Sequence, residues 1–256
     1  MSYTSTSYFK FLRKATNQHG VHSPFVYTLL TECLYDRKPR DVYGKLSDYR
    51  TALRNNDTMI SVTDYGAGSR VFKGNDRKVS AIAKHAGATT KRTKLLARCM
   101  PYFTPETVLE LGTSLGIGTA ALATVSSAKV ISLEGCPATA AVAKRQLRHF
   151  GYSNVDVVVG RFRESITTLL PARFDIIYFD GNHSKAATLA YVQLLLPTVH
   201  NDTVWMFDDL HWSAEMTEAW QEIKDMEQVR VTIDCFWLGF VFFRTEQEKE
   251  HFTLRL

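Results

Sequence analysis

Hydrophobic and polar residues follow two different rhythms along the chain, and the change falls near residue 104. From there onward, short apolar runs typical of buried strands alternate with segments that have apolar residues at helical spacing. The expected strands are 108–111, 129–133, 155–159, 174–179 and 203–207, and the expected helices are 118–125, 138–150, 165–170, 186–196 and 214–226. This alternation predicts an α/β fold with a doubly wound sheet of mainly parallel strands.

Two more apolar runs, 229–235 and 239–244, end the pattern. Only Phe236, Trp237 and Leu238 separate them, which is too short for a helix that crosses over the sheet. We therefore expect an antiparallel hairpin. Its apolar surface either belongs to the core or forms the seam of a homodimer.

Residues 1–103 show little strand character. Apolar residues recur at helical spacing in 8–15, 25–34, 79–85 and 90–99, and Ser23 followed by Pro24 suits the start of the second segment. We therefore divide the chain into a mainly helical N-terminal cap or substrate region, 1–103, and an α/β domain, 104–256.

Charge divides the chain at the same place. Residues 1–103 hold 18 lysines and arginines against 7 aspartates and glutamates, whereas residues 104–256 hold 13 against 19. Two interpretations stay open. The two parts attract each other, or the basic part meets an anionic substrate such as RNA, a phosphate ester or a lipid headgroup.

The cysteines and apolar runs bear on the compartment. Cys33, Cys99, Cys136 and Cys235 are scattered, which argues against a disulfide framework or a zinc site. The first ten residues lack the apolar core of a signal peptide, and the longest apolar run, 235–243, is too short to cross a bilayer. We expect a cytoplasmic protein without membrane insertion.

Glycines follow the first strand of the α/β domain. Gly112, Gly116 and Gly118 stand between this strand and an Ala/Leu-rich helix. Such a turn lets the backbone approach a ligand closely, and the helix start offers free N–H groups. The pattern predicts a nucleotide-type cradle.

The spacing and charge of this cradle narrow the ligand. Gly-x-x-x-Gly-x-Gly differs from the Gly-x-Gly-x-x-Gly fingerprint of dinucleotide enzymes, and Glu110 would repel a pyrophosphate. Glu134, at the end of the second strand, is placed to accept hydrogen bonds from ribose hydroxyls. S-adenosylmethionine, with a cationic end and a ribose, fits better than NAD, although NAD is not excluded.

Further carboxylates follow later strands. Asp180 ends the fourth strand, and Asp208 and Asp209 end the fifth. Because parallel strands bring their carboxyl ends to one edge of a sheet, we expect these groups to gather beside the cradle.

On these motifs, residues 104–244 resemble a class I S-adenosylmethionine-dependent methyltransferase with a Rossmann-like sheet. Residues 110–116 are similar to its first motif and 131–134 to its ribose motif. Residues 179–183 and 206–209 are similar to the strand-four and strand-five motifs of the metal-dependent branch that contains catechol O-methyltransferase.

The resemblance implies roles for individual residues. Methionine-end contacts would come from Glu110, Gly112 and Gly116, the ribose contact from Glu134, and adenine contacts from Gly160 and Arg161. The full cofactor-binding set is Glu110, Gly112, Thr113, Gly116, Gly118, Glu134, Gly160, Arg161 and Asp180. Asp180, Asp208 and Asp209 would bind Mg²⁺ or a similar divalent cation. Asp209 departs from the family pattern, where asparagine is usual.

Two histidines are candidates for the general base. His183 stands where that branch often has a lysine, and His211 follows the strand-five motif. A histidine pKa suits proton transfer at neutral pH. The structural alternative for His183 is a helix-entry residue bonded to backbone.

A second glycine-containing stretch, 64–78, has no amphipathic helix directly after it. We interpret it as a surface turn or as an anion-contacting loop that uses Arg70, Lys73, Arg77 and Lys78.

The predicted function is O-methylation of a small hydroxylated, catechol-like acceptor with the help of a divalent metal. Four alternatives remain: methylation of an anionic substrate such as RNA, metal-independent methyl transfer, an NAD-dependent oxidoreductase, and a non-catalytic S-adenosylmethionine-binding protein.

Overall fold

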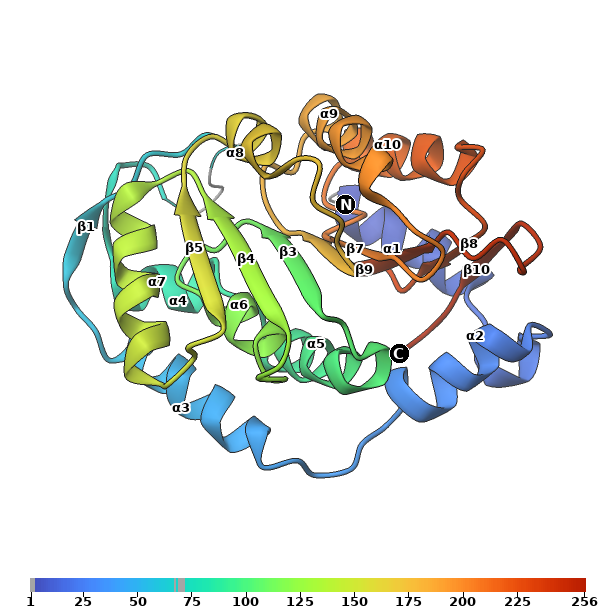
Figure 1. The fold of residues 1–256 in the computed structure, drawn as a ribbon, viewed down its shortest axis with the longest axis horizontal. Helices are drawn as coiled ribbons and strands as arrows, with labels where there is room; N and C mark the ends of the chain where they lie inside the picture. The colour runs from blue at the N-terminus through green and yellow to red at the C-terminus, as the bar shows by residue number, and fades with distance from the viewer. Residues whose placement is uncertain (1–2, 67, 69–71) are drawn as a thin grey trace.

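The strands that follow residue 104 form one twisted sheet in the computed structural model, which describes residues 3–66, 68 and 72–256 (Figure 1). Its strand order is β10-β8-β9-β7-β6-β3-β4-β5. The bounds are β3 (Thr107–Leu111), β4 (Lys129–Glu134), β5 (Val155–Val159), β6 (Ile176–Phe179), β7 (Val204–Asp208), β8 (Val231–Asp234), β9 (Leu238–Phe242) and β10 (Glu250–Thr253). Strands β3 to β7 pair in parallel, and β9 is antiparallel to both neighbours. The predicted parallel sheet and closing hairpin are confirmed.

Three strands were not predicted. β10 pairs in parallel with β8 at the edge of the sheet, and β1 (Met59–Ser61) pairs with β2 (Asp76–Lys78) in a separate two-stranded ribbon. These strands are short and partly exposed, so they carry no buried apolar run that a sequence pattern could reveal.

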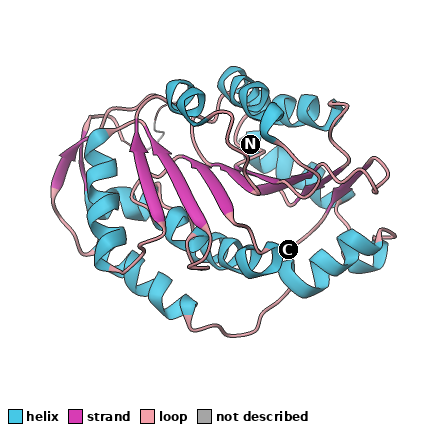
Figure 2. Cartoon of the chain, in the orientation of Figure 1, coloured by secondary structure: helices cyan, strands magenta, loops and turns pink. Residues whose placement is uncertain are grey.

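Helices cover both faces of the sheet (Figure 2). The helices of the α/β part are α6 (Ile117–Leu122), α7 (Pro137–His149), α8 (Phe162–Leu169), α9 (Lys185–Leu195) and α10 (Ala214–Asp225), with a 3-10 turn, η3 (Leu196–Thr198), after α9. Alternate strand residues point to opposite faces: Ile176 and Tyr178 of β6 belong to one buried cluster, and Ile177 belongs to the other. The helices α8, α9 and α10 pack on the second face.

The N-terminal part is mainly helical, as predicted. It comprises α1 (Tyr3–Lys14), η1 (Gln18–Gly20), α2 (Pro24–Leu29), the π-helical turn η2 (Leu30–Leu34), α3 (Val42–Arg54), α4 (Val79–His85) and α5 (Thr90–Phe103). Ser23 caps α2 by accepting a hydrogen bond from the Val26 N–H, with Pro24 at the first position. None of the helices in the described ranges is long and apolar enough to cross a membrane.

The helices α2 to α5 share one hydrophobic core with the sheet. Leu29 of α2 and Leu53 of α3 are fully buried in the same cluster as Val108 of β3 and Phe242 of β9. The Tyr49 hydroxyl of α3 donates to the Leu115 carbonyl in the glycine turn, 2.9 Å away. The N-terminal helices therefore support the sheet and its glycine turn directly.

Because of this shared core, Leu29→Ala is expected to lower the free energy of unfolding of the whole chain by about 2–5 kcal/mol. Chemical denaturation followed by fluorescence and circular dichroism measures the change. The exposed Thr28→Ala on the same helix is the matched control and should change stability by less than about 0.5 kcal/mol. Two separate transitions, of which only one moves with Leu29→Ala, would contradict a shared core.

Candidate functional site

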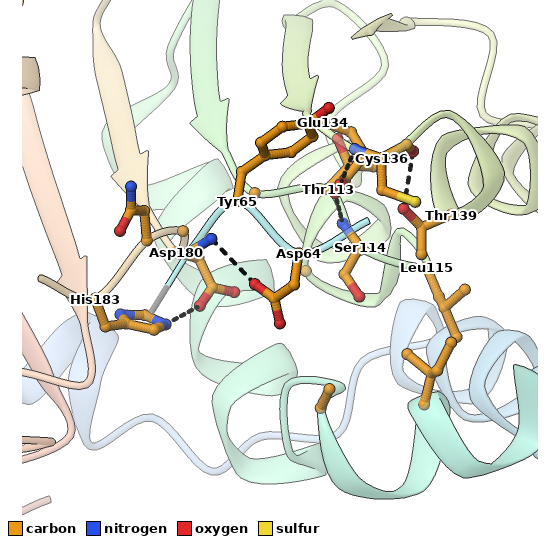
Figure 3. A pocket seen from close by; sticks show the side chains of 18 of the residues that line it. Asp64, Tyr65, Thr113, Ser114, Leu115, Glu134, Cys136, Thr139, Asp180 and His183 are labelled. Atoms are coloured by element: carbon orange, nitrogen blue, oxygen red, sulfur yellow. Dashed lines mark hydrogen bonds and ion pairs between the residues drawn. The ribbon is translucent and has the colours of Figure 1, made fainter. Parts of the chain in front are cut away.

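A cavity of about 760 Å³ opens at the carboxyl ends of the parallel strands (Figure 3). Its walls come from the turns after β3, β4, β5, β6 and β7 and from the segments around β1, α4 and the start of α5. Nine of the residues predicted from the sequence line it: Gly112, Thr113, Gly118, Glu134, Arg161, Asp180, His183, Asp208 and Asp209. The fold therefore gathers the strand-end carboxylates as the parallel topology required.

The glycines have different tasks. Gly112 has a positive φ of 113°, and a Cβ atom there would collide with the Asp180 carbonyl oxygen. Gly116 also has a positive φ, 79°, but its added Cβ would meet the Tyr49 hydroxyl at 2.5 Å. Gly116 does not line the cavity. A glycine is needed there because α3, through Tyr49, packs closely against this position.

Glu134 is held rigidly at the end of β4. Its carboxylate accepts the Ser114 N–H at 2.7 Å and the Cys136 N–H at 2.8 Å. Burial raises the pKa of Glu134, opposed by these backbone donors. The aromatic ring of Tyr65 lies close by in Figure 3, with the Arg161 guanidinium 5.3 Å from its centroid. The ring and the carboxylate thus border one part of the cavity.

Glu110 is fully buried behind the cavity wall. It accepts hydrogen bonds from the hydroxyls of Thr119 and Ser132 at 2.5 Å, whereas its Oε1 atom has no partner among the described residues. Burial raises the pKa of Glu110 to about 7. A Cβ atom on Gly118 would lie 2.9 Å from this Oε1, so Gly118, which lines the cavity, lies directly against Glu110.

Arg92 of α5 neutralises the acidic edge. Its guanidinium lies 2.5 Å from Asp208 Oδ2 and 2.5 Å from Asp209 Oδ1, and it stacks 5.4 Å from the Trp237 ring centroid. Although burial opposes its charge, Asp208 and Asp209 hold the pKa of Arg92 above its ordinary value. The sequence analysis missed Arg92, because one basic position among many in a helical segment gives no sign of its partners.

Among the described residues, no lysine or arginine forms an ion pair with the neighbouring Asp180, although the charge of Arg92 acts on it. Burial, followed by the charge of Asp209, raises the pKa of Asp180 to about 7. Burial and the nearby Asp180 also raise the pKa of Asp208 well above its ordinary value. One oxygen of Asp208, Oδ1, is buried without a hydrogen-bond partner in the described part of the chain.

The set predicted for Mg²⁺, Asp180, Asp208 and Asp209, converges but does not fit a divalent cation as it lies. The guanidinium of Arg92 already pairs with one carboxylate oxygen of Asp208, at the end of β7, and with one of Asp209, which follows it. A divalent cation would need these same oxygens as ligands. Across residues 3–66, 68 and 72–256, no group of three or more His, Cys, Asp or Glu side chains is arranged to hold a metal ion.

The two candidate bases have different surroundings. His183 lines the cavity, and its Nε2 lies 3.9 Å from Asp180 Oδ1 (Figure 3). Burial lowers the pKa of His183, so its imidazole is neutral at neutral pH. His211 lies outside the cavity wall, where it binds Asp234 at 2.9 Å and stacks on Phe236.

Of the remaining predicted residues, some line the cavity and others do not. Gly160 does not line the cavity, and its N–H donates to the Glu134 carbonyl. Of the predicted anion-contacting loop, Arg77 lines the cavity 3.8 Å from Asp64, while Lys78 pairs with Asp57. Arg70 lies outside the described residues.

Comparison with known proteins identifies the motif-bearing segment. Residues 109–210 match the family model described as a methyltransferase domain. The catechol O-methyltransferase of Mycobacterium tuberculosis is 32% identical over 106 residues, which are 40% of this chain and 47% of that protein. The matching segment therefore spans about half the length of this curated relative.

Solved structures with the same fold cover most of the chain. An SAH-bound methyltransferase of Podospora anserina aligns with a TM-score of 0.62 at 13% identity, over 88% of this chain and 97% of that one. The SAM complex of the O-methyltransferase TomG from Streptomyces achromogenes, which is involved in tomaymycin synthesis, gives 0.57 at 15% identity over 86% and 95%. At these identities the likeness concerns the fold alone. Residues 109–210 therefore match a methyltransferase domain, and the chain around them shares the fold of solved methyltransferases.

Proposed function

We propose that the protein transfers a methyl group from S-adenosylmethionine to a hydroxyl oxygen of a small acceptor. The observation that carries this proposal is that the glycine turn, Glu134 and His183 line one cavity of about 760 Å³. This volume falls in the usual range for small-molecule sites, roughly 300–1,000 Å³. The catechol O-methyltransferase relative supports a hydroxylated acceptor.

The cradle residues suit the proposed cofactor, which supplies an electrophilic methyl group on a sulfonium when bound. Glu134 is oriented by two backbone N–H groups and retains lone pairs for ribose hydroxyls. The unpartnered Oε1 of Glu110 favours positive charge just beyond Gly118. Gly112 keeps the backbone of the glycine turn close to Asp180. The glycine turn and the end of β6 therefore border the same cavity.

His183 is the proposed general base. Because burial lowers its pKa, the imidazole is neutral and able to accept the proton of an acceptor hydroxyl. Asp180, 3.9 Å from Nε2, would then stabilise the imidazolium that forms. After losing its proton, the acceptor oxygen would face the cofactor side of the same cavity. The protein would assist the methyl transfer chiefly by positioning the two reactants.

The proposed reaction does not use a divalent cation. Arg92 supplies permanent positive charge at Asp208 and Asp209, where the metal-dependent branch would use those oxygens as ligands. The structure thus favours the metal-independent form of methyl transfer over the metal-assisted form.

His183→Ala is expected to lower kcat by about 10²–10⁴-fold, the usual contribution of a general base. Because burial lowers the pKa of His183 below its ordinary 6.5, the wild-type rate should persist below pH 6.5 before it falls. A pH–rate profile of methyl transfer, with S-adenosylhomocysteine as the measured product, tests both points. His211→Ala, outside the cavity, is the matched control, and equal losses in the two variants would contradict the assignment.

Removal of divalent cations is expected to leave turnover unchanged. Dialysis against EDTA followed by assay with and without added Mg²⁺ tests this directly. Arg92→Met should lower the free energy of unfolding by about 3–5 kcal/mol, because it leaves buried carboxylates without their cation. Loss of turnover in EDTA that Mg²⁺ restores would contradict the metal-independent form.

Glu134→Ala is expected to weaken S-adenosylmethionine binding by roughly tenfold or more, since hydrogen bonds to a charged group contribute about 1.5–3 kcal/mol. Calorimetry with S-adenosylmethionine and, separately, NAD measures the change and also tests the oxidoreductase alternative. Glu164→Ala, an exposed glutamate of α8, is the control. Tighter binding of NAD than of S-adenosylmethionine would overturn the proposed cofactor.

A further inference from the structure

A second cavity, of about 650 Å³, lies apart from the proposed active site. Its walls are the connection between η2 and α3, one face of α5, Trp237 in the turn between β8 and β9, and Leu256. Lys91, Lys94, Leu95 and Arg98 line it at the spacing of a single helix face. The two cavities have no described lining residue in common.

Positive charge dominates this second cavity. Its described lining contains six lysines and arginines, Arg37, Lys38, Arg40, Lys91, Lys94 and Arg98, and one acidic side chain, Asp36. Asp36 is already paired with Arg40 at 2.6 Å. Arg98 donates to the carbonyls at the end of η2, and Lys91 donates one of its three N–H groups to a Leu256 oxygen 2.9 Å away. Four cationic side chains, Arg37, Lys38, Lys91 and Lys94, have no carboxylate side chain opposite them in the described lining. Such a concave, one-signed surface concentrates anions.

Aromatic rings accompany the charges. Lys94 Nζ lies 5.0 Å from the Tyr43 ring centroid, and Lys91 Nζ lies 5.8 Å from that of Trp237. Rings placed beside ammonium groups offer stacking faces next to phosphate-binding positions.

Two buried hydrogen-bond donors on this wall lack acceptors. Arg40 Nε and the Tyr43 hydroxyl are both buried, and neither has a hydrogen-bond partner among the described residues. Buried polar groups are nearly always paired, so unpaired donors beside a cavity indicate a missing acceptor. A phosphate group is rich in acceptor oxygens and matches the fork of an arginine.

We propose that this second cavity is a binding site for a small organic phosphate that carries a planar ring, of the nucleoside diphosphate class. The phosphates would lie among Lys91, Lys94 and Arg37, on the side of the cavity where Arg40 and Tyr43 lie, and the ring would stack on Trp237. The volume suits a ligand of this size. The site is independent of the proposed methyl transfer, and its described lining comes from the N-terminal region, the β8–β9 turn and Leu256.

Calorimetric titration of the full chain with ADP, in the presence of saturating S-adenosylhomocysteine to fill the first cavity, tests the proposal. We expect saturable one-to-one binding that weakens as salt rises. Lys91→Gln with Lys94→Gln should weaken it by about tenfold or more, in line with the loss of two charge-assisted contacts. Retained S-adenosylhomocysteine affinity in this variant shows that it folds.

Lys144→Gln, an exposed lysine of α7 far along the chain from this wall, is the charge control and should bind ADP as the wild type does. Inorganic phosphate and adenosine, titrated alone, should each bind more weakly than ADP. The proposal is overturned if ADP does not bind, if Lys144→Gln weakens binding as much as the wall variant, or if either half-ligand binds as well as ADP. Tighter, wall-dependent binding of a single-stranded RNA would overturn the small-ligand class instead.

Discussion

The proposed site depends on one contact, the double ion pair between Arg92 and the two aspartates at the end of β7, Asp208 and Asp209. Parallel strands bring Asp180, Asp208 and Asp209 to one sheet edge, where burial makes several negative charges costly. Arg92 reaches this edge from α5 and binds Asp208 and Asp209 at 2.5 Å each. Asp180 forms no ion pair with Arg92, and burial raises its pKa, so that its neutral form is favoured.

The proposed cofactor side of the cavity depends on a different constraint, the close approach of two backbone segments. Gly112 brings the turn after β3 against the chain at Asp180, and Gly118 leaves Glu110 just behind the wall. Glu110 and Asp180 therefore lie in one acidic neighbourhood, both with a pKa near 7. A positively charged ligand would favour their ionised forms, so binding of the proposed cofactor would be linked to proton release.

Sequence patterns predicted the sheet and its edge but not the partners of that edge. The strands were readable because each is a buried apolar run, and topology alone then gathered the residues at their ends. β10 was missed because Glu250–Thr253 is a partly exposed edge strand. Arg92 was missed because its contacts lie 116 and 117 residues away in the sequence, and no local spacing records such a pairing.

Because Arg92 belongs to the N-terminal region, the proposed site extends beyond the segment that carries the motifs. A fragment that began at residue 104 would contain every recognised motif and would still hold more acidic than basic residues, 19 against 13. It would also lose Tyr49, whose hydroxyl supports the glycine turn. The motif-bearing segment is thus a recognisable unit of sequence, whereas the smallest unit able to assemble this site includes α3 and α5.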